Sequence, residues 1–271
     1  MTKTAIILTG PTASGKSAIA LDIAAQFNFV IINADSKQLY REIPIITAQP
    51  SEAEKQVICH KLYGTISVKE HSTVNSWLNL VKQAIDETYA ANKTPLLVGG
   101  TGLYIKSLVE GISPIPDIEQ NIREQTRALF NQIGNLNFYQ ELIALDPISA
   151  NRLKPGDSQR LQRFYEVIKQ TGISIFTWQE KPSIKILPDI NYKIFFLSPP
   201  RETVYQNSDL RFTKMLNEGA IEEARAVIEM NLDQNLPAFR AHGLPELISY
   251  INGDLSLNQA TEIAQKNTQP L

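Results

Sequence analysis

The sequence contains one cysteine, Cys59, among its 271 residues. A single thiol permits neither an intramolecular disulfide framework nor a cysteine-based metal site. The three histidines, His60, His71 and His242, lack metal-ligand spacing, and no H-E-x-x-H motif is present. We therefore interpret the histidines as structural, and we exclude a disulfide-stabilised secreted domain.

Long apolar runs and a strong charge of one sign are also missing. No apolar run reaches the roughly 20 residues that a membrane-spanning helix needs, and no charged-then-apolar signal segment opens the chain. The formal net charge is −2, so bulk electrostatics does not indicate a nucleic-acid binder, although a local basic face would suffice. We expect a cytoplasmic protein that does not associate with membranes.

Residues 10–17 read GPTASGKS and match the phosphate-binding loop G-x-x-x-x-G-K-S/T in full. Gly10 and Gly15 permit backbone conformations that turn N–H groups toward phosphate oxygens. Lys16 can reach the outer phosphates, and the Ser17 hydroxyl can ligate Mg²⁺. An apolar strand before the loop and a helix after it supply the required context. The sequence predicts a site for a di- or triphosphate with Mg²⁺.

Short apolar runs predict four core strands at residues 5–8, 29–33, 95–98 and 192–197. Helical stretches separate them, including 73–91 and 102–109, and this alternation is typical of a parallel sheet covered on both faces. The predicted fold class is therefore α/β, with a P-loop-type parallel sheet flanked by helices. Further helices are expected at 158–169, 203–217 and 220–230, with a final pair beyond Pro245.

The pattern changes between Gly111 and Pro155, where no strand is indicated. Helical periodicity covers residues 118–133 and 138–145, and the Pro-rich stretch 113–116 is typical of a domain edge. We predict an all-helical insert at residues 114–155 in an α/β core formed by residues 1–113 and 156–271.

The predicted second strand ends in the sequence NADSKQLY at residues 33–40. Because the carboxyl ends of parallel strands line the ligand crevice, we expect Asp35 near the phosphate loop. There it could bind Mg²⁺, act as a general base or merely cap a following helix. A second glycine turn, VGGTGLY at 98–104, could present the Thr101 hydroxyl, or serve only close strand-to-helix packing.

Arginines provide the remaining candidates. Arg160 and Arg163 are spaced to share one helix face, which could hold phosphates or simply be solvated. Arg211 follows the last predicted strand, where it could stabilise a leaving phosphate as lid arginines do. No apolar strand ends in Asp-Glu or Asp-x-x-Gly, as in many NTP-hydrolysing enzymes.

In their order along the chain, these segments resemble the tRNA dimethylallyltransferases, also called tRNA isopentenyltransferases. The matching segments cover nearly the whole chain: GPTASGKS at 10–17, ADSKQLYR at 34–41, VGGTGLYIKSLVEG at 98–111, GDSQRLQRFYEV at 156–167, LRFTKMLNEG at 210–219 and residues 243–253. The short Asp-Ser-x-Gln-x-Tyr sequence paired with GGTGLY is the most specific combination.

The resemblance implies transfer of a dimethylallyl group from dimethylallyl diphosphate to N6 of the adenine adjacent to the anticodon. The phosphate loop would hold the diphosphate leaving group and not ATP. The implied catalytic residues are Asp35 as the base, Thr101 near the reacting centre and Arg211 on the departing diphosphate. The target base has to leave its stack, which suits a single-stranded anticodon loop.

The resemblance also implies the binding residues and partners. The diphosphate site would comprise Gly10, Pro11, Thr12, Ala13, Ser14, Gly15, Lys16 and Ser17, with Mg²⁺ as cofactor on Ser17. The tRNA site would comprise Asp35, Ser36, Lys37, Gln38, Thr101, Arg123, Gln159, Arg160, Leu161, Gln162 and Arg163. The implied partners are dimethylallyl diphosphate and the anticodon stem-loop of tRNA, which the helical insert would grip. We expect a monomer.

The chain departs from the family pattern at three places. Lys37 stands where an apolar residue is usual, Phe164 and Tyr165 replace Ala-Leu, and we expect the basic C-terminal segment of the family to be lacking. The alternatives are a P-loop small-molecule kinase, prenyl transfer to a free adenine nucleotide, and a truncated, inactive remnant of the transferase. A kinase has no required role for GGTGLY or ADSKQLY, and the insert favours RNA.

Overall fold

The computed structural model describes residues 3–149 and 152–267. The chain divides into two compact units, one formed by Met1–Val109 with Ile186–Leu271 and the other by Glu110–Lys185. Residues 1–2, 150–151 and 268–271 lie outside the described residues. Every helix in the described ranges is too short or too polar to cross a bilayer.

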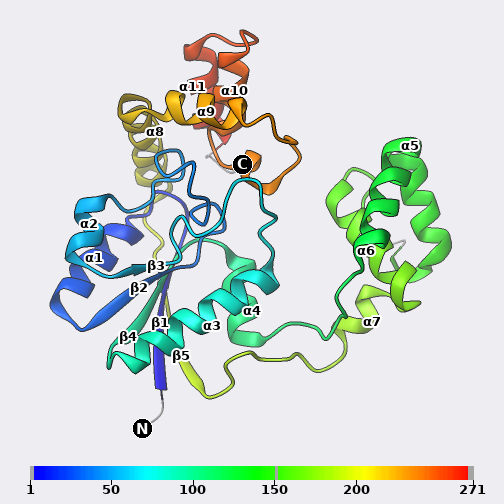
Figure 1. Cartoon of the computed structure of the whole chain (residues 1–271), viewed down its shortest axis with the longest axis horizontal. Helices are drawn as coiled ribbons and strands as arrows, with labels where there is room; N and C mark the ends of the chain where they lie inside the picture. Colours follow the sequence, from blue (N-terminus) through cyan, green and yellow to red (C-terminus); the bar gives the residue numbers. More distant parts are fainter. Residues whose placement is uncertain (1–2, 150–151, 268–271) are drawn as a thin grey trace. The chain divides into compact units, whose positions relative to one another are not determined.

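The first unit is built on a five-stranded parallel sheet of order β3-β2-β4-β1-β5 (Figure 1). The strands are β1 (Lys3–Thr9), β2 (Phe29–Asn33), β3 (His60–Lys61), β4 (Thr94–Val98) and β5 (Ile190–Phe196). The predicted α/β class with a parallel sheet is confirmed. The sequence did not indicate β3, because two residues are too few to form an apolar run.

Helices cover both faces of this sheet, with α1 (Lys16–Gln26) on one side and α3 (Val74–Ala90) and α4 (Gly102–Glu110) on the other (Figure 1). Ala20 and Ala24 of α1 pack in one apolar cluster with Leu8, Ile31 and Leu96. Burial on both faces explains why the central strands read as continuous apolar runs.

A helical layer completes the first unit. It contains α8 (Arg201–Glu218), α9 (Ala220–Glu229), the 3₁₀ helix η2 (Pro237–Arg240), α10 (Leu244–Ile251) and α11 (Leu257–Asn267). The short helix α2 (Glu52–Val57) precedes β3 in the chain and lies near α1 (Figure 1). Helices α8 to α10 share an apolar core with residues of the loop after β2, including Tyr40, Ile43 and Ile46. This packing brings a loop near residue 45 against helices more than 150 positions later, as Ile45 N–H and Ile46 N–H both donate to the Glu223 carboxylate at 2.8 and 2.9 Å.

The second unit is helical, as the sequence predicts for the insert. It contains α5 (Gln120–Leu145), the 3₁₀ helix η1 (Pro147–Ser149), α6 (Ser158–Thr171) and α7 (Ile175–Gln179). Gly134, with φ 74° and ψ 171°, interrupts α5, so this helix consists of two segments close to the two predicted ones.

The predicted end of the insert at residue 155 has to be corrected. Leu161 and Phe164 of α6 are buried in one apolar cluster with Phe138 and Leu142 of α5, and Ile175 of α7 joins them. Residues 156–185, which we assigned to the α/β core, therefore belong to the helical unit, which ends at Lys185.

Candidate functional site

The phosphate loop connects β1 to α1 and requires its glycines. Gly10 has φ 151°, and a Cβ there would lie 2.5 Å from the Leu197 carbonyl oxygen. Gly15, with φ 88°, caps α1 and supplies no side-chain hydrogen bond. The first N–H groups of α1 therefore lack a side-chain cap, and a helix N-terminus in this state favours an anion.

Lys16, the first residue of α1, curls back over the loop. Its Nζ donates to the carbonyl oxygens of Gly10 and Pro11 at 2.9 and 2.6 Å, and to Ser14 Oγ at 3.4 Å. Burial lowers the pKa of Lys16 to about 8; the Asp35 carboxylate opposes this shift and the Arg211 guanidinium adds to it. Within the described residues Lys16 forms no ion pair, so its charge is balanced only at a distance.

Asp35 follows β2 and closes a turn. Its Oδ1 accepts a hydrogen bond from Lys37 N–H at 2.9 Å, and the Asn33 side chain bonds both the N–H and the carbonyl of Asp35 at 2.7 and 2.9 Å. The next helix begins only at Glu52, so the helix-cap alternative is excluded. Oδ2 accepts no hydrogen bond from the described residues, and this leaves one carboxylate oxygen available for chemistry.

The second glycine turn packs directly on the backbone that carries Asp35. A Cβ on Gly99 would lie 2.2 Å from the carbonyl carbon of Ala34 and 2.6 Å from the Asp35 nitrogen. Thr101 Oγ1 accepts from Ser36 N–H at 2.9 Å, and Thr101 N–H donates to the Ala34 carbonyl at 3.3 Å. Thr101 and Ser36 are thus bonded to each other beside Asp35.

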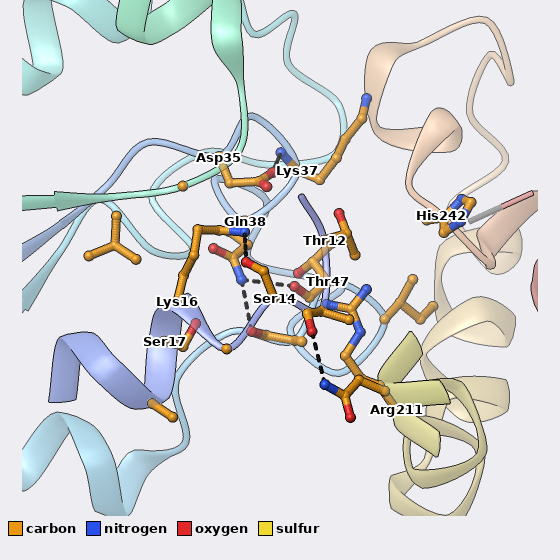
Figure 2. A pocket seen from close by; sticks show the side chains of 18 of the residues that line it. Thr12, Ser14, Lys16, Ser17, Asp35, Lys37, Gln38, Thr47, Arg211 and His242 are labelled. Atoms are coloured by element: carbon orange, nitrogen blue, oxygen red, sulfur yellow. Dashed lines mark hydrogen bonds between the residues drawn. The ribbon is translucent and has the colours of Figure 1, made fainter. Parts of the chain in front are cut away.

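Arg211 extends from α8 into the pocket that Figure 2 shows. Burial lowers the pKa of Arg211, and the Asp35 carboxylate opposes that shift. In the part of the chain that the structure describes, its guanidinium has no hydrogen bond and no ion pair. One turn earlier, Asn207 Nδ2 donates to the Ala13 carbonyl at 3.3 Å, so α8 is attached to the phosphate loop.

These groups line a single pocket of about 700 Å³ (Figure 2). Of the predicted residues, the structure brings together Thr12, Ala13, Ser14, Gly15, Lys16, Ser17, Asp35, Lys37, Gln38 and Arg211. The carbonyl oxygens of Gly10 and Pro11 accept hydrogen bonds from Lys16 Nζ, and Ser36 N–H donates to Thr101 Oγ1 beside Asp35. The volume is within the range of small-molecule sites.

Lys37 and Gln38 use their side-chain donors within the protein. Lys37 Nζ donates to the Pro237 carbonyl at 2.6 Å. Gln38 Nε2 donates to the carbonyls of Thr47 and Ala48 at 3.0 and 2.8 Å. Both side chains therefore fasten distant loops around the pocket. Among the described residues, the carbonyl oxygen of Gln38 and two of the three N–H donors of Lys37 remain for another partner.

Sequence reasoning missed several pocket residues, including Thr47, Asn207, Lys214 and His242. The spacing of Asn207, Arg211 and Lys214 places them on one face of α8. Once Arg211 was a candidate, this spacing could have identified Asn207 and Lys214. His242, which we interpreted as structural, also lines the pocket. Thr47 carries no sequence signal, because the Gln38 side chain and the Glu223 carboxylate position its loop.

The other predicted tRNA contacts belong to the second unit. Arg123 Nε donates to the Ile118 carbonyl at 3.3 Å, and Arg163 pairs with Glu166 at 3.7 Å. The Arg160 guanidinium lies over the Phe164 ring, 5.4 Å from its centroid. Gln159 and Gln162 share α6 with these arginines. Leu161 is fully buried in the core, so its side chain cannot touch RNA.

With this geometry in view, the five-stranded parallel sheet flanked by helices defines an α/β protein of the P-loop fold type. The IPP transferase family matches residues 38–271, and the chain belongs to this family.

Named relatives and solved structures agree with this assignment. The tRNA dimethylallyltransferase of Ehrlichia ruminantium (strain Welgevonden) is 49% identical over 264 residues, which cover 97% of this chain and 87% of that protein. The tRNA dimethylallyltransferase of Rickettsia massiliae (strain Mtu5) is 44% identical over 267 residues, 98% of this chain and 74% of that protein. A eukaryotic dimethylallyltransferase solved acting on tRNA is similar with a TM-score of 0.79 at 25% identity, over 98% of this chain and 67% of that one. The full-length tRNA isopentenylpyrophosphate transferase of Bacillus halodurans gives 0.68 at 27% identity, over 98% and 83%.

Proposed function

We propose that this chain transfers a dimethylallyl group from dimethylallyl diphosphate to N6 of the adenine adjacent to the anticodon in tRNA. One observation carries the proposal. Two cations without ion-pair partners in the described residues, Lys16 and Arg211, line the same pocket as a carboxylate oxygen of Asp35 that accepts no hydrogen bond there. Family membership supports prenyl transfer, and the relatives named above are tRNA dimethylallyltransferases.

The cations would stabilise the leaving group. In the transfer, the bond between the allylic carbon and the diphosphate oxygen breaks, and the electron pair leaves with the diphosphate. The N–H groups at the start of α1, Lys16 and Arg211 would hold the charge that develops there, because fixed donors in a partly buried site stabilise a transition state strongly. Asn207 would support this arrangement by attaching α8 to the loop.

Asp35 would accept the proton that the adenine amino group loses as N6 bonds to the allylic carbon. Its Oδ1 is anchored on Lys37 N–H, so the free Oδ2 has a defined position. Thr101 would act through this turn, because it binds the N–H of the neighbouring Ser36.

The residues present fit a magnesium ion shared with the substrate. The Ser17 hydroxyl lines the pocket, and Mg²⁺ commonly takes one or two protein oxygens together with substrate phosphates and water. Among the described residues, no group of three or more His, Cys, Asp or Glu could hold a metal alone. When bound, the ion would neutralise part of the diphosphate charge, with Ser17 as its protein ligand.

We assign tRNA binding to the turn around Asp35 and to the second unit. Arg123, Arg160 and Arg163 supply cationic groups, and Gln159 and Gln162 of α6 supply amides. A flipped base in a single-stranded anticodon loop would reach the pocket without opening a duplex. We place the reaction in the cytoplasm, and the proposal requires one chain only.

The test is a transfer assay with Mg²⁺ and dimethylallyl diphosphate labelled in the allyl group. Unmodified tRNA, AMP and ATP are offered in parallel reactions. We expect label in tRNA alone. Label in AMP or ATP would instead indicate nucleotide prenylation. Absence of label from a folded chain that still binds diphosphate would favour the inactive remnant. A kinase would transfer phosphate from ATP without using the allyl donor.

A further inference from the structure

His242 occupies the turn between η2 and α10, and its side chain lines the diphosphate pocket (Figure 2). The neighbouring Ala241 and Leu244 are fully buried. Gly243 has φ 88°, and a Cβ there would lie 2.5 Å from Cε2 of Phe212. Because Phe212 follows Arg211 on α8, this close packing fixes the histidine near the arginine that faces the proposed leaving group.

The imidazole has an unused nitrogen. Nε2 of His242 is buried and has no hydrogen-bond partner among the described residues. Buried polar atoms are nearly always bonded, since leaving one unpaired costs free energy. Because the His242 ring lines the pocket that requires an anion, a bound anion can supply the partner that this nitrogen lacks.

The charges facing His242 come from two helices, Arg211 of α8 and Glu246 of α10. Burial lowers the pKa of His242, Glu246 opposes this shift, and Arg211 adds to it. Glu246 is fixed, because its Oε1 accepts a hydrogen bond from Asn267 Nδ2 at 2.8 Å. Lys214 of α8 lines the same pocket. A diphosphate beside Arg211 would cancel the cationic repulsion, and the imidazole would then favour its protonated form.

We propose that His242 is a further diphosphate-binding residue, whose Nε2–H donates to a diphosphate oxygen and whose ring takes up a proton from solvent as the diphosphate binds. This inference rests on the proposed function of the pocket. No covalent bond changes in the step except that the buffer gives up one proton and the imidazole gains it. The departing diphosphate thus meets a third cation, one that is charged only when the anion is present.

The test measures proton uptake when magnesium diphosphate binds. Calorimetric titrations near pH 7, in buffers of different ionisation enthalpy, are run with the native chain and with His242→Gln, which keeps a donor but cannot titrate. We expect proton uptake per diphosphate to be larger for the native chain than for His242→Gln by roughly half a proton or more. Protons that diphosphate itself takes up or releases on binding contribute equally to both proteins and cancel in the difference. We also expect His242→Ala to bind diphosphate about 10-fold more weakly.

A second measurement needs no substitution that might cause misfolding. The chain has three histidines, so their ring protons can be followed by NMR as pH is varied. We expect the pKa of one histidine to rise on addition of magnesium diphosphate, and His71→Gln, at an exposed position, to keep that signal. Equal proton uptake by the native chain and His242→Gln, with no histidine pKa moved, would overturn the role of His242 and leave the diphosphate site standing. A native chain that does not bind diphosphate would overturn both.

Discussion

Asp35 has its two carboxylate oxygens in different surroundings. Oδ1 accepts from Lys37 N–H and closes the turn, whereas Oδ2 has no partner among the described residues. One oxygen is therefore structural and the other is available to a substrate. An asparagine side chain has nearly the same shape as an aspartate side chain, so a substitution can separate these two roles.

We predict that Asp35→Asn lowers transfer by about 10²–10⁴-fold, the usual contribution of a general base. Asparagine Oδ1 can still accept from Lys37 N–H, so diphosphate binding should persist. Labelled transfer and calorimetric diphosphate binding measure the two effects, with Asp22→Asn at an exposed position of α1 as the control. Parallel loss of transfer and of diphosphate binding would show that Asp35 is not the base.

Lys16 predicts a pH dependence of diphosphate binding. Burial, the largest cause, lowers its pKa to about 8, so the ammonium is charged below this pH and neutral above it. Diphosphate affinity should therefore fall as pH rises from 7 through about 8 toward 9.5, with a slope of at most about tenfold per pH unit. The Lys16→Arg side chain stays charged over this range, so the affinity of that variant changes with pH only through the titration of diphosphate itself. It is therefore the control. If the diphosphate affinity of the native chain follows that of Lys16→Arg at every pH, the role of Lys16 as a titrating diphosphate ligand is refuted.

At the scale of elements, the loop after β1, the turn after β2 and the glycine turn after β4 meet at one edge of the sheet. The sequence predicted this meeting, because parallel strands place their carboxyl ends together. It could not predict the contribution of Thr47 or His242. Their positions follow from the packing of α8 to α10 against a loop far away in the sequence, which no local pattern records.

We predict that Gly99→Ala is far more damaging than its size suggests. A Cβ there would lie 2.2 Å from backbone of Ala34, which cannot move without displacing Asp35. We expect a loss of about 1–3 kcal/mol in the free energy of unfolding, together with a marked loss of transfer. The control is Gly102→Ala, where a Cβ meets nothing within 4 Å. Denaturant unfolding and the transfer assay would show both effects, and equal behaviour of the two substituted chains would contradict the proposed close packing.

At the scale of the whole molecule, the chain consists of a first unit that contains the pocket and a helical second unit. The helical unit was predicted, but its end at residue 155 was placed too early. The amphipathic pattern of α6 shows that the helix has an apolar side and does not show which surface that side covers. Only the three-dimensional cluster of Leu161 and Phe164 with Phe138 assigns α6 to the helical unit.

This division predicts that tRNA binding and diphosphate binding can be lost separately. The double substitution Arg160→Ala with Arg163→Ala should weaken tRNA binding and leave diphosphate affinity unchanged, because both arginines lie in the second unit. Loss of two phosphate contacts should also reduce the salt dependence of tRNA binding by a slope of roughly 1–2. Lys169→Ala removes a cation from the opposite side of α6 and is the control. If the doubly substituted chain binds tRNA as the native chain does, at every salt concentration, these arginines are excluded from the interface.

The central claim is that an adenine in tRNA receives the dimethylallyl group while diphosphate leaves in the pocket. The most direct measurement quantifies both products in one reaction, released diphosphate and N6-dimethylallyl adenosine from digested tRNA by mass spectrometry. We predict equal amounts of the two products from the native chain, and about 10²–10⁴-fold less of each from Asp35→Asn in the same time. Diphosphate release without formation of the modified nucleoside would contradict this claim.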